Sequence, residues 1–356
     1  MKRRFPRTEL ISVILIFLHG CAHSDLSAER SSPPQVPEKR VTQNLPLPGD
    51  LEDKVLALNP DSIREKDVTE VLSRCPAPRI IALNGSIPFI TMESFSKFLI
   101  LMGYPEESVR NPRTGFYSYS SYMSSRNLAG LIAWHYEKEG MMPIVVGHSQ
   151  GGMLSIKVLY EFSGAFHNKI AVWNPYRNKP EDRYTLWDPL TDTERPVVGL
   201  RLGYASAIAT GRLMRIVLGQ WNMLARLRKI PDTVEEFTGY HIENDLIGGD
   251  FPGSGQSYYP LGTAIVHNVN LPPEYSHITI PLTEDLAKDP ETREWISFYA
   301  SPTEHAPLTT ALRGKSDNIL FAADIWHSIK KYWCIELQRL IRARRAMNKV
   351  FSTYGG

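Results

Sequence analysis

A run of β-prone residues passes directly into a helical pattern near the middle of the chain. Residues 144–146 are Ile-Val-Val and favour a strand, and residues 153–159 continue as a helix. The segment between them contains Gly147-His148-Ser149-Gln150-Gly151, which is short enough for only a sharp turn. Ser149 would lie at the corner of that turn. A buried strand followed by a helix that packs back on it is therefore the first constraint on the fold.

Short apolar runs alternate with helical segments over most of the chain, which is typical of a parallel sheet covered on both faces. The predicted strands are residues 79–83, 115–120, 143–146, 169–173, 236–241 and 262–267. The predicted helices are residues 61–73, 92–102, 124–139 and 152–162. We therefore predict an α/β fold with a mostly parallel sheet of about six strands flanked by helices.

Two further helical regions follow from apolar residues at helical spacing. Residues 176–235 are too long for an ordinary connection and include an apolar, basic stretch. They predict a helical cap insertion, either a mobile lid or a helix pair packed on the sheet. Residues 322–351 predict a basic amphipathic C-terminal helix, which either packs on the body or contacts a membrane surface or a partner.

The N-terminal residues have the features of an export signal. A basic start is followed by an apolar run at residues 10–18, which is too short to span a membrane comfortably. The run ends in Leu18-His19-Gly20-Cys21, which resembles a bacterial lipobox, although His19 stands where a small residue is expected. The resemblance implies a signal peptide over residues 1–21 and a lipid anchor at Cys21. The alternative is a plain signal peptide cleaved nearby.

The residue after the lipobox bears on location. Ala22, rather than Asp, implies sorting to the outer membrane in a Gram-negative bacterium, so we expect an outer-membrane lipoprotein or a periplasmic protein.

Residues 22–50 are rich in Ser, Pro and charged residues and predict a flexible tether, with the folded body at residues 51–356. In an oxidising compartment Cys75 and Cys334 could form a disulfide or remain two buried thiols.

Composition excludes some functions. A net charge of +2 on 356 residues does not predict nucleic-acid binding. The sequence contains no clustered His and Cys ligands of the kind that hold zinc, so we expect no metal and no organic cofactor.

The Gly-x-Ser-x-Gly turn at Ser149 resembles the nucleophile elbow of α/β-hydrolases, in which the serine is followed along the chain by an acid and then a histidine. The resemblance implies Ser149 as nucleophile and His277 as base. His267 is the main competitor, and the other histidines late in the chain are His241, His305 and His327.

The acid belongs in the loop after the strand predicted at residues 236–241. Asp245 fits that place, and Asp250 and Glu243 are alternatives.

An acyl-transfer site also needs N–H donors for the oxyanion. The turn offers the amide of Gln150, and resemblance to lipases implies the amide of Ser86, although Asn84 replaces their usual histidine. The aromatic run at residues 116–122 either lines a ligand site or packs in the core.

Together these residues predict a serine esterase or lipase acting on an acyl ester or lipid through an acyl-enzyme. A thioesterase, acyltransferase or peptidase would use the same groups, and a non-catalytic binding or envelope lipoprotein on a hydrolase scaffold is the alternative from another class.

Overall fold

The computed structural model describes residues 47–212, 215, 216, 218–242, 245, 247, 248, 257–272, 274–300 and 318–354, with side chains up to residue 349. The predicted signal peptide 1–21, the lipidation site Cys21 and most of the tether 22–50 lie outside these residues. The first described helix, α2 (Gly49–Ala57), begins two residues before the predicted end of the tether.

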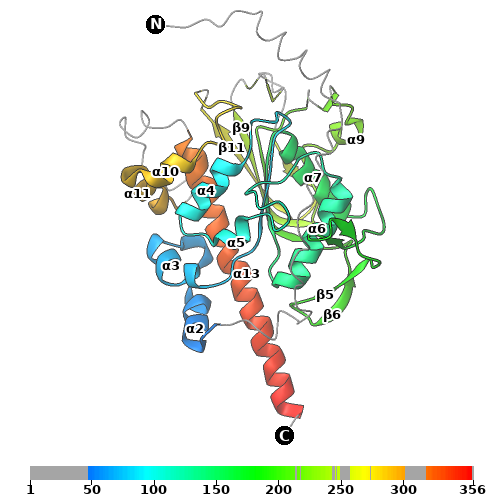
Figure 1. Ribbon diagram of the computed structural model, residues 1–356, viewed down its shortest axis with the longest axis vertical. Coiled ribbons are helices and arrows are strands. Elements are labelled where there is room, and N and C mark those ends of the chain that lie inside the picture. Colours follow the sequence, from blue (N-terminus) through cyan, green and yellow to red (C-terminus); the bar gives the residue numbers. More distant parts are fainter. Residues whose placement is uncertain are drawn as a thin grey trace, which may run out of the picture. The chain divides into compact units, whose positions relative to one another are not determined.

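The centre of the fold is a parallel five-stranded sheet flanked by helices (Figure 1). Its strands are β1 (Ile80–Leu83), β2 (Ile144–His148), β7 (Leu202–Ile208), β9 (Val234–Ile242) and β11 (Ile265–Leu271), in that spatial order. Register pairs Leu83 with Gly147, and Gly147 in turn with Ala207. Because all five strands run in the same direction, the loops after them meet at one edge of the sheet.

Alternate residues of the buried strands enter two separate cores, whereas the edge strand β11 is mostly exposed. Ile80 and Ala82 face one core, with α4 (Glu93–Leu101) and α13 (Ile319–Tyr354), while Ile81 and Leu83 face the other. The second core is covered by α6 (Ser125–Glu139) and α7 (Gln150–Phe162). Figure 1 shows α13 in red on the other side of the sheet from α6 and α7 in green. Apolar runs without alternation are expected for strands covered on both faces.

The strand β7 corrects the prediction of a helical cap over residues 176–235. Residues 202–208 lie inside that range but form the middle strand of the sheet, with every residue buried. The strand is rich in small residues because helices approach it closely. A Cβ atom added to Gly203 would lie 2.8 Å from the ring of Tyr332 on α13. Such a strand lacks the bulky β-branched residues by which buried strands are recognised.

Two other predicted strands are wrong. Residues 115–120 form no strand and only a single bridge between Tyr119 and Leu83. Residues 169–173 contribute only Trp173 to β3 (Trp173–Asn174), which pairs with β4 (Lys179–Pro180) away from the main sheet. The helix predicted at 61–73 is broken into shorter pieces. The helices predicted at 92–102, 124–139 and 152–162 are confirmed by α4, α6 and α7.

The remaining elements are short. Those before and between the main strands are η2 (Pro60–Ser62), α3 (Glu65–Glu70), η3 (Leu72–Arg74) and α5 (Glu106–Val109). A hairpin joins β5 (Thr185–Asp188) to β6 (Thr193–Pro196), and α9 (Trp221–Leu224) follows β7. The last are β8 (Lys229–Ile230), β10 (Tyr259–Pro260), α10 (Glu284–Lys288) and α11 (Pro290–Phe298).

The long helix α13 confirms the C-terminal helix predicted from the sequence, and its apolar face packs on the body. Trp333 and Leu337 are fully buried, and the side-chain amide of Gln338 donates to the carbonyl oxygens of Val55 and Leu58 at 2.9 Å each. Of the alternatives predicted for this helix, packing on the body is therefore confirmed for its apolar face. None of the described helices is long and apolar enough to cross a membrane.

The two cysteines of the body are free, buried thiols and form no disulfide in this structure. Burial raises the pKa of Cys75 to about 11 and that of Cys334 to about 12.

Candidate active site

Ser149 occupies the corner between β2 and α7 in a backbone conformation that non-glycine residues seldom adopt. Its φ is +52° and its ψ is −109°. The Ser149 N–H donates to the carbonyl of Ile208 at 2.8 Å, and the Thr210 hydroxyl donates to the carbonyl of Ser149 at 3.0 Å. The end of β7 therefore holds the turn in place through both polar groups of the Ser149 backbone.

The glycines around Ser149 are required by close backbone approach. A Cβ atom on Gly147 would lie 2.3 Å from the carbonyl of Gly151, and one on Gly151 would lie 2.4 Å from the carbonyl oxygen of Leu83. Both distances are far below van der Waals contact. The Gly-x-Ser-x-Gly spacing thus lets the start of α7 rest directly on the end of β1.

His277 and Asp245 form a buried pair, as the sequence predicts. The Nδ1 atom of His277 lies 2.7 Å from Oδ2 of Asp245, and each side chain is 3% exposed. The other carboxylate oxygen of Asp245 accepts the N–H of Gly248 at 2.8 Å. Because an ionised carboxylate can only accept, Nδ1 carries the proton and Nε2 of a neutral His277 is left as a base.

His148 connects this pair to the turn. Its ring lies beside that of His277, with centroids 4.9 Å apart, and its Nε2 lies 2.9 Å from the carbonyl oxygen of His277. A carbonyl only accepts, so Nε2 of His148 is the donor. Burial, and then the neighbouring His277, lower the pKa of His148 well below its usual value. A neutral His148 therefore fixes the backbone of His277 from the residue next to Ser149.

The loop after β1 lies against Ser149. A Cβ atom on Gly85 would be 3.5 Å from Cβ of Ser149, which places the next residue, the buried Ser86, near the turn. The Tyr122 hydroxyl donates to the Ser86 carbonyl at 2.9 Å, and the Ser121 hydroxyl donates to the Gly85 carbonyl at 3.0 Å. The aromatic run at 116–122 therefore braces this loop.

Gln150 begins α7, so its N–H has no acceptor within the helix. The two amides predicted for an oxyanion, those of Gln150 and Ser86, thus belong to segments that meet beside Ser149. The side-chain oxygen of Gln150 accepts from Arg215, whose guanidinium also donates to Gln220 at 2.6 Å. Arg215 is buried, and burial lowers its pKa to about 10.

The other candidate bases lie elsewhere. His267 on β11 is half exposed and lies 3.7 Å from Glu236. His241 stacks on Tyr258 with its Nε2 3.3 Å from Asn268, and burial lowers its pKa to about 4. His327 lies on α13 beside Tyr299. His305 and the alternative acids Asp250 and Glu243 lie outside the described residues.

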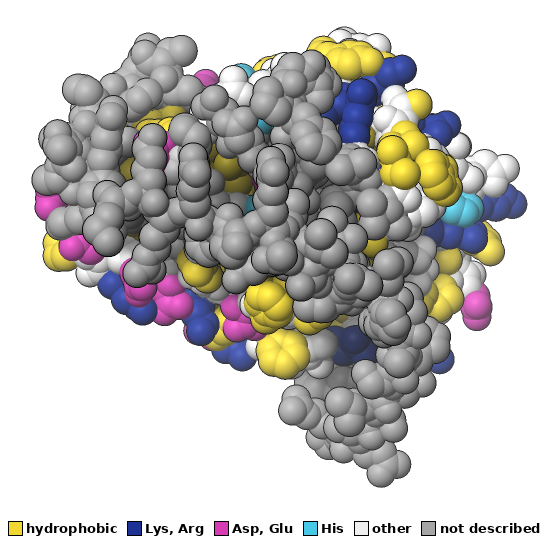
Figure 2. All heavy atoms as spheres, turned by 90° about the horizontal axis from the view of Figure 1, so that it is seen from above, with side chains coloured by type: hydrophobic (Ala, Val, Ile, Leu, Met, Phe, Trp, Pro, Cys, Tyr) yellow, Lys and Arg dark blue, Asp and Glu magenta, His cyan; other side chains and the backbone are white. Residues whose placement is uncertain are grey.

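The surface beside the site mixes apolar and basic side chains. Figure 2 shows hydrophobic and Lys or Arg side chains close together on the side of the molecule where α9 lies. Ile216 is 44% exposed and Trp221 is 62% exposed. Ile216 directly follows Arg215 in the chain, and the Arg215 side chain donates to Gln150 next to Ser149.

Sequence reasoning missed His148, Thr210 and Arg215. The position of His148 inside the glycine motif was the one available signal for its role. Thr210 and Arg215 are far from Ser149 in the sequence and reach the turn only in the folded protein. Both follow the strand β7, which was not predicted.

No model of a known protein family and no curated protein sequence matches this chain. Within the described residues, no group of three or more His, Cys, Asp or Glu side chains is placed to hold a metal ion.

Proposed function

We propose that this protein is a serine hydrolase of the α/β-hydrolase type that cleaves carboxylic esters. The main support is the buried Asp245–His277 pair at 2.7 Å, joined through His148 to the strained corner at Ser149. Asp245 follows β9, His277 follows β11 and Ser149 follows β2. Along the chain they occur in the order Ser, Asp, His that is typical of that superfamily. The five-stranded parallel sheet is compatible with this assignment.

In the proposed mechanism, the Ser149 hydroxyl oxygen attacks the acyl carbonyl carbon while Nε2 of His277 takes the hydroxyl proton. Asp245 stabilises the resulting imidazolium. The amides of Gln150 and Ser86 donate to the oxyanion of the tetrahedral intermediate. The alcohol leaves with the proton from His277, and an acyl-enzyme remains. Water then attacks the acyl-enzyme with His277 as base, and the acid and Ser149 are released.

Labelling with a fluorophosphonate tests whether Ser149 is activated. The probe should modify Ser149 in the native protein, and Ser149→Ala should abolish both labelling and ester hydrolysis without loss of folding. The matched control is Ser155→Ala, because Ser155 is fully buried in the same helix and its hydroxyl has no partner among the described residues. An unchanged hydrolysis rate in Ser149→Ala would exclude the proposal.

We propose an acyl ester or lipid as the substrate class. The exposed Ile216 and Trp221 beside the Gln150–Arg215 contact support an apolar acyl group near Ser149. A panel of p-nitrophenyl esters of increasing acyl length, with amide and thioester analogues, tests this. Faster turnover of the amide or thioester would reassign the protein to the peptidases or thioesterases, and transfer to an added alcohol would indicate an acyltransferase.

Export and lipid anchoring at Cys21 are also proposals, supported by the basic and apolar start of the chain. The mass of the mature N-terminal peptide tests them. A diacylated Cys21 should be found in the membrane fraction, and Cys21→Ala should release the protein. An unmodified N-terminus beyond Cys21 would instead show a plain signal peptide.

A further inference from the structure

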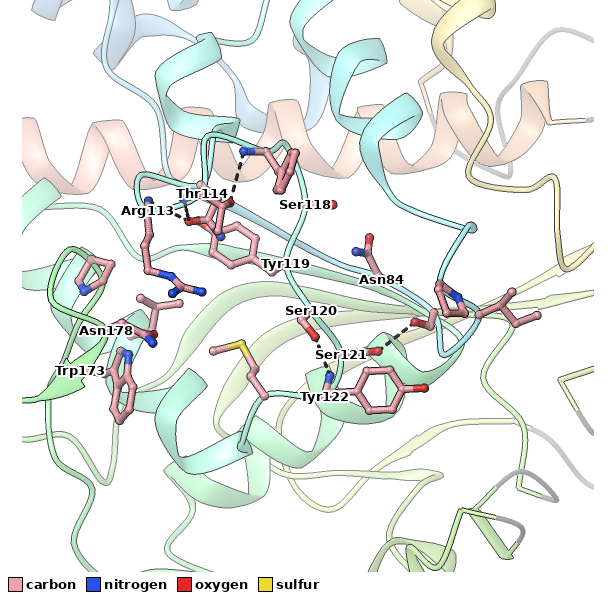
Figure 3. A pocket seen from close by; sticks show the side chains of 18 residues that line it. Asn84, Arg113, Thr114, Ser118, Tyr119, Ser120, Ser121, Tyr122, Trp173 and Asn178 are labelled. Carbon is pink, nitrogen blue, oxygen red and sulfur yellow. Dashed lines mark hydrogen bonds between the residues drawn. The ribbon is translucent and has the colours of Figure 1, made fainter. Parts of the chain in front are cut away.

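A pocket adjoins the loop that lies against Ser149. Its volume is about 430 Å³, within the range of small-molecule sites. It is enclosed by residues 84–88, by residues 111–123 and by the β3–β4 ribbon around Trp173 (Figure 3). Gly85 lines the pocket, and a Cβ atom added to it would lie 3.5 Å from Cβ of Ser149, so the loop that holds Gly85 lies between the two sites.

Three of the polar side chains that line this pocket, Asn84, Asn111 and Ser120, accept a backbone N–H through their oxygen and so keep N–H or O–H groups as donors. The Asn84 side-chain oxygen accepts the N–H of Met92 at 2.8 Å, and the Asn111 side-chain oxygen accepts the N–H of Arg113 at 3.0 Å. Because a backbone N–H can only donate, each amide is oriented with its oxygen on the backbone. The NH₂ groups of both asparagines remain available as donors. Ser120 likewise accepts the N–H of Tyr122 at 3.2 Å and keeps its own proton to donate.

The pocket carries a positive charge at the exposed Arg113, which no described carboxylate offsets. Arg113 lines it, no Asp or Glu does, and no carboxylate in the described part of the chain forms an ion pair with Arg113. The loop that carries Arg113 is held by two backbone bonds between residues 111 and 115–116, at 2.8 and 2.9 Å. Figure 3 shows Arg113 extending toward Asn178 and Trp173 across the pocket.

A set of fixed donors with one guanidinium and no acidic side chain suits a ligand rich in acceptors. We propose that this pocket binds an oxyanion, the phosphate or carboxylate group of the ester substrate, with Arg113 as its principal contact. That the bound group is part of the ester substrate rests on the proposed hydrolase function. The binding of an oxyanion in this pocket does not rest on it. Trp173 offers an aromatic surface to the organic part next to that group.

Calorimetric titration of the full-length protein with inorganic phosphate, glycerol phosphate and neutral glycerol tests the pocket. Both phosphates should bind and glycerol should not, with glycerol phosphate the tighter if an organic headgroup is recognised. Arg113→Gln should weaken phosphate binding at least tenfold. Arg201→Gln is the matched control, because Arg201 is exposed and precedes β7 at the opposite edge of the sheet. Absence of phosphate binding, or equal binding by Arg113→Gln, would overturn the proposal.

Fluorophosphonate labelling of the wild type beside this titration separates this proposal from the hydrolase proposal. Phosphate binding that depends on Arg113 in a wild-type protein that fluorophosphonate does not label would support the pocket and refute the hydrolase. If labelling succeeds, acetylated glycerol phosphate should be hydrolysed with a higher kcat/KM than acetylglycerol. Arg113→Gln should reduce that preference at least tenfold, and an unchanged preference would exclude this pocket from substrate recognition.

Discussion

The backbone of Ser149 is held in a conformation that costs roughly 1–3 kcal/mol for a residue other than glycine. The bonds from its N–H to Ile208 and from Thr210 to its carbonyl are local interactions that offset this cost. Strain of this kind persists only where the surroundings determine it, and it is common at reactive sites. At this position it directs the serine out of the strand and places the start of α7 behind it.

Asp245→Asn tests the role of the buried carboxylate. An amide of the same size would present its NH₂ group or a neutral oxygen to Nδ1 of His277, which removes the charge that stabilises the imidazolium. We expect kcat for ester hydrolysis to fall by about 10³–10⁴, with little change in KM. Asp285→Asn, on an almost fully exposed side chain, should leave kcat unchanged. An unaltered rate in Asp245→Asn would return the role of acid to Asp250 or Glu243.

Single residues were predictable to different degrees. Ser149 and Gln150 were found from the local pattern, because strand, turn and helix are encoded within a few positions. Asp245, Asp250 and Glu243 all fit the expected order of groups along the chain, and only a turn pattern resembling that of α/β-hydrolases favoured Asp245. The bond from His148 to His277 could not be predicted, since its acceptor is a backbone carbonyl that folding brings from a distant loop.

Among the elements, the sequence predicted the other four strands of the sheet better than its middle strand. β1, β2, β9 and β11 contain several bulky apolar, aromatic or β-branched residues, whereas β7 reads Leu-Gly-Tyr-Ala-Ser-Ala-Ile. Small residues are required there because α13 and α7 pack close on either face. The apolar residues that follow β7 have helical spacing, and this spacing led to the prediction of a helical cap over residues 176–235.

The helix α13 provides a test of packing at the scale of one element. Leu337 is fully buried in the core that α13 covers, so Leu337→Ala should lower the free energy of unfolding by about 2–5 kcal/mol. Asn348→Ala, at an exposed position of the same helix, should change it by less than about 0.5 kcal/mol. Urea unfolding should show a lower midpoint for Leu337→Ala at an unchanged slope. Equal stability of both variants would contradict the packing of this helix.

For the whole molecule, buried histidines predict a loss of stability on the acid side. Burial, and then Lys330 and Lys331, lower the pKa of His327 from 6.5 to about 4, and the pKa values of His148 and His241 are also lowered by burial. Below pH 6.5 the unfolded chain takes up protons that the folded protein does not. Each such histidine therefore removes up to about 1.4 kcal/mol of stability per pH unit between pH 6.5 and its folded pKa.

Comparison of the wild type with His327→Gln isolates one of these contributions. The variant should lose less stability than the wild type between pH 6.5 and 4.5 when unfolding by urea is measured at each pH. Parallel pH profiles of the two proteins would show that His327 does not contribute.

The position of α13 also affects how the protein acquires its structure during synthesis. Arg345 on this helix contacts Glu52 on α2 at 2.9 Å, so the first and last described helices pack together. Apolar side chains on one face of the sheet, such as Ile80, Val146 and Tyr240, belong to the core that α13 covers. A nascent chain therefore leaves these side chains only partly covered, by elements such as α4, until residues 319–341 have left the ribosome. Folding of this half of the molecule must wait for α13, and a chaperone that binds exposed apolar strands would have that whole interval in which to act.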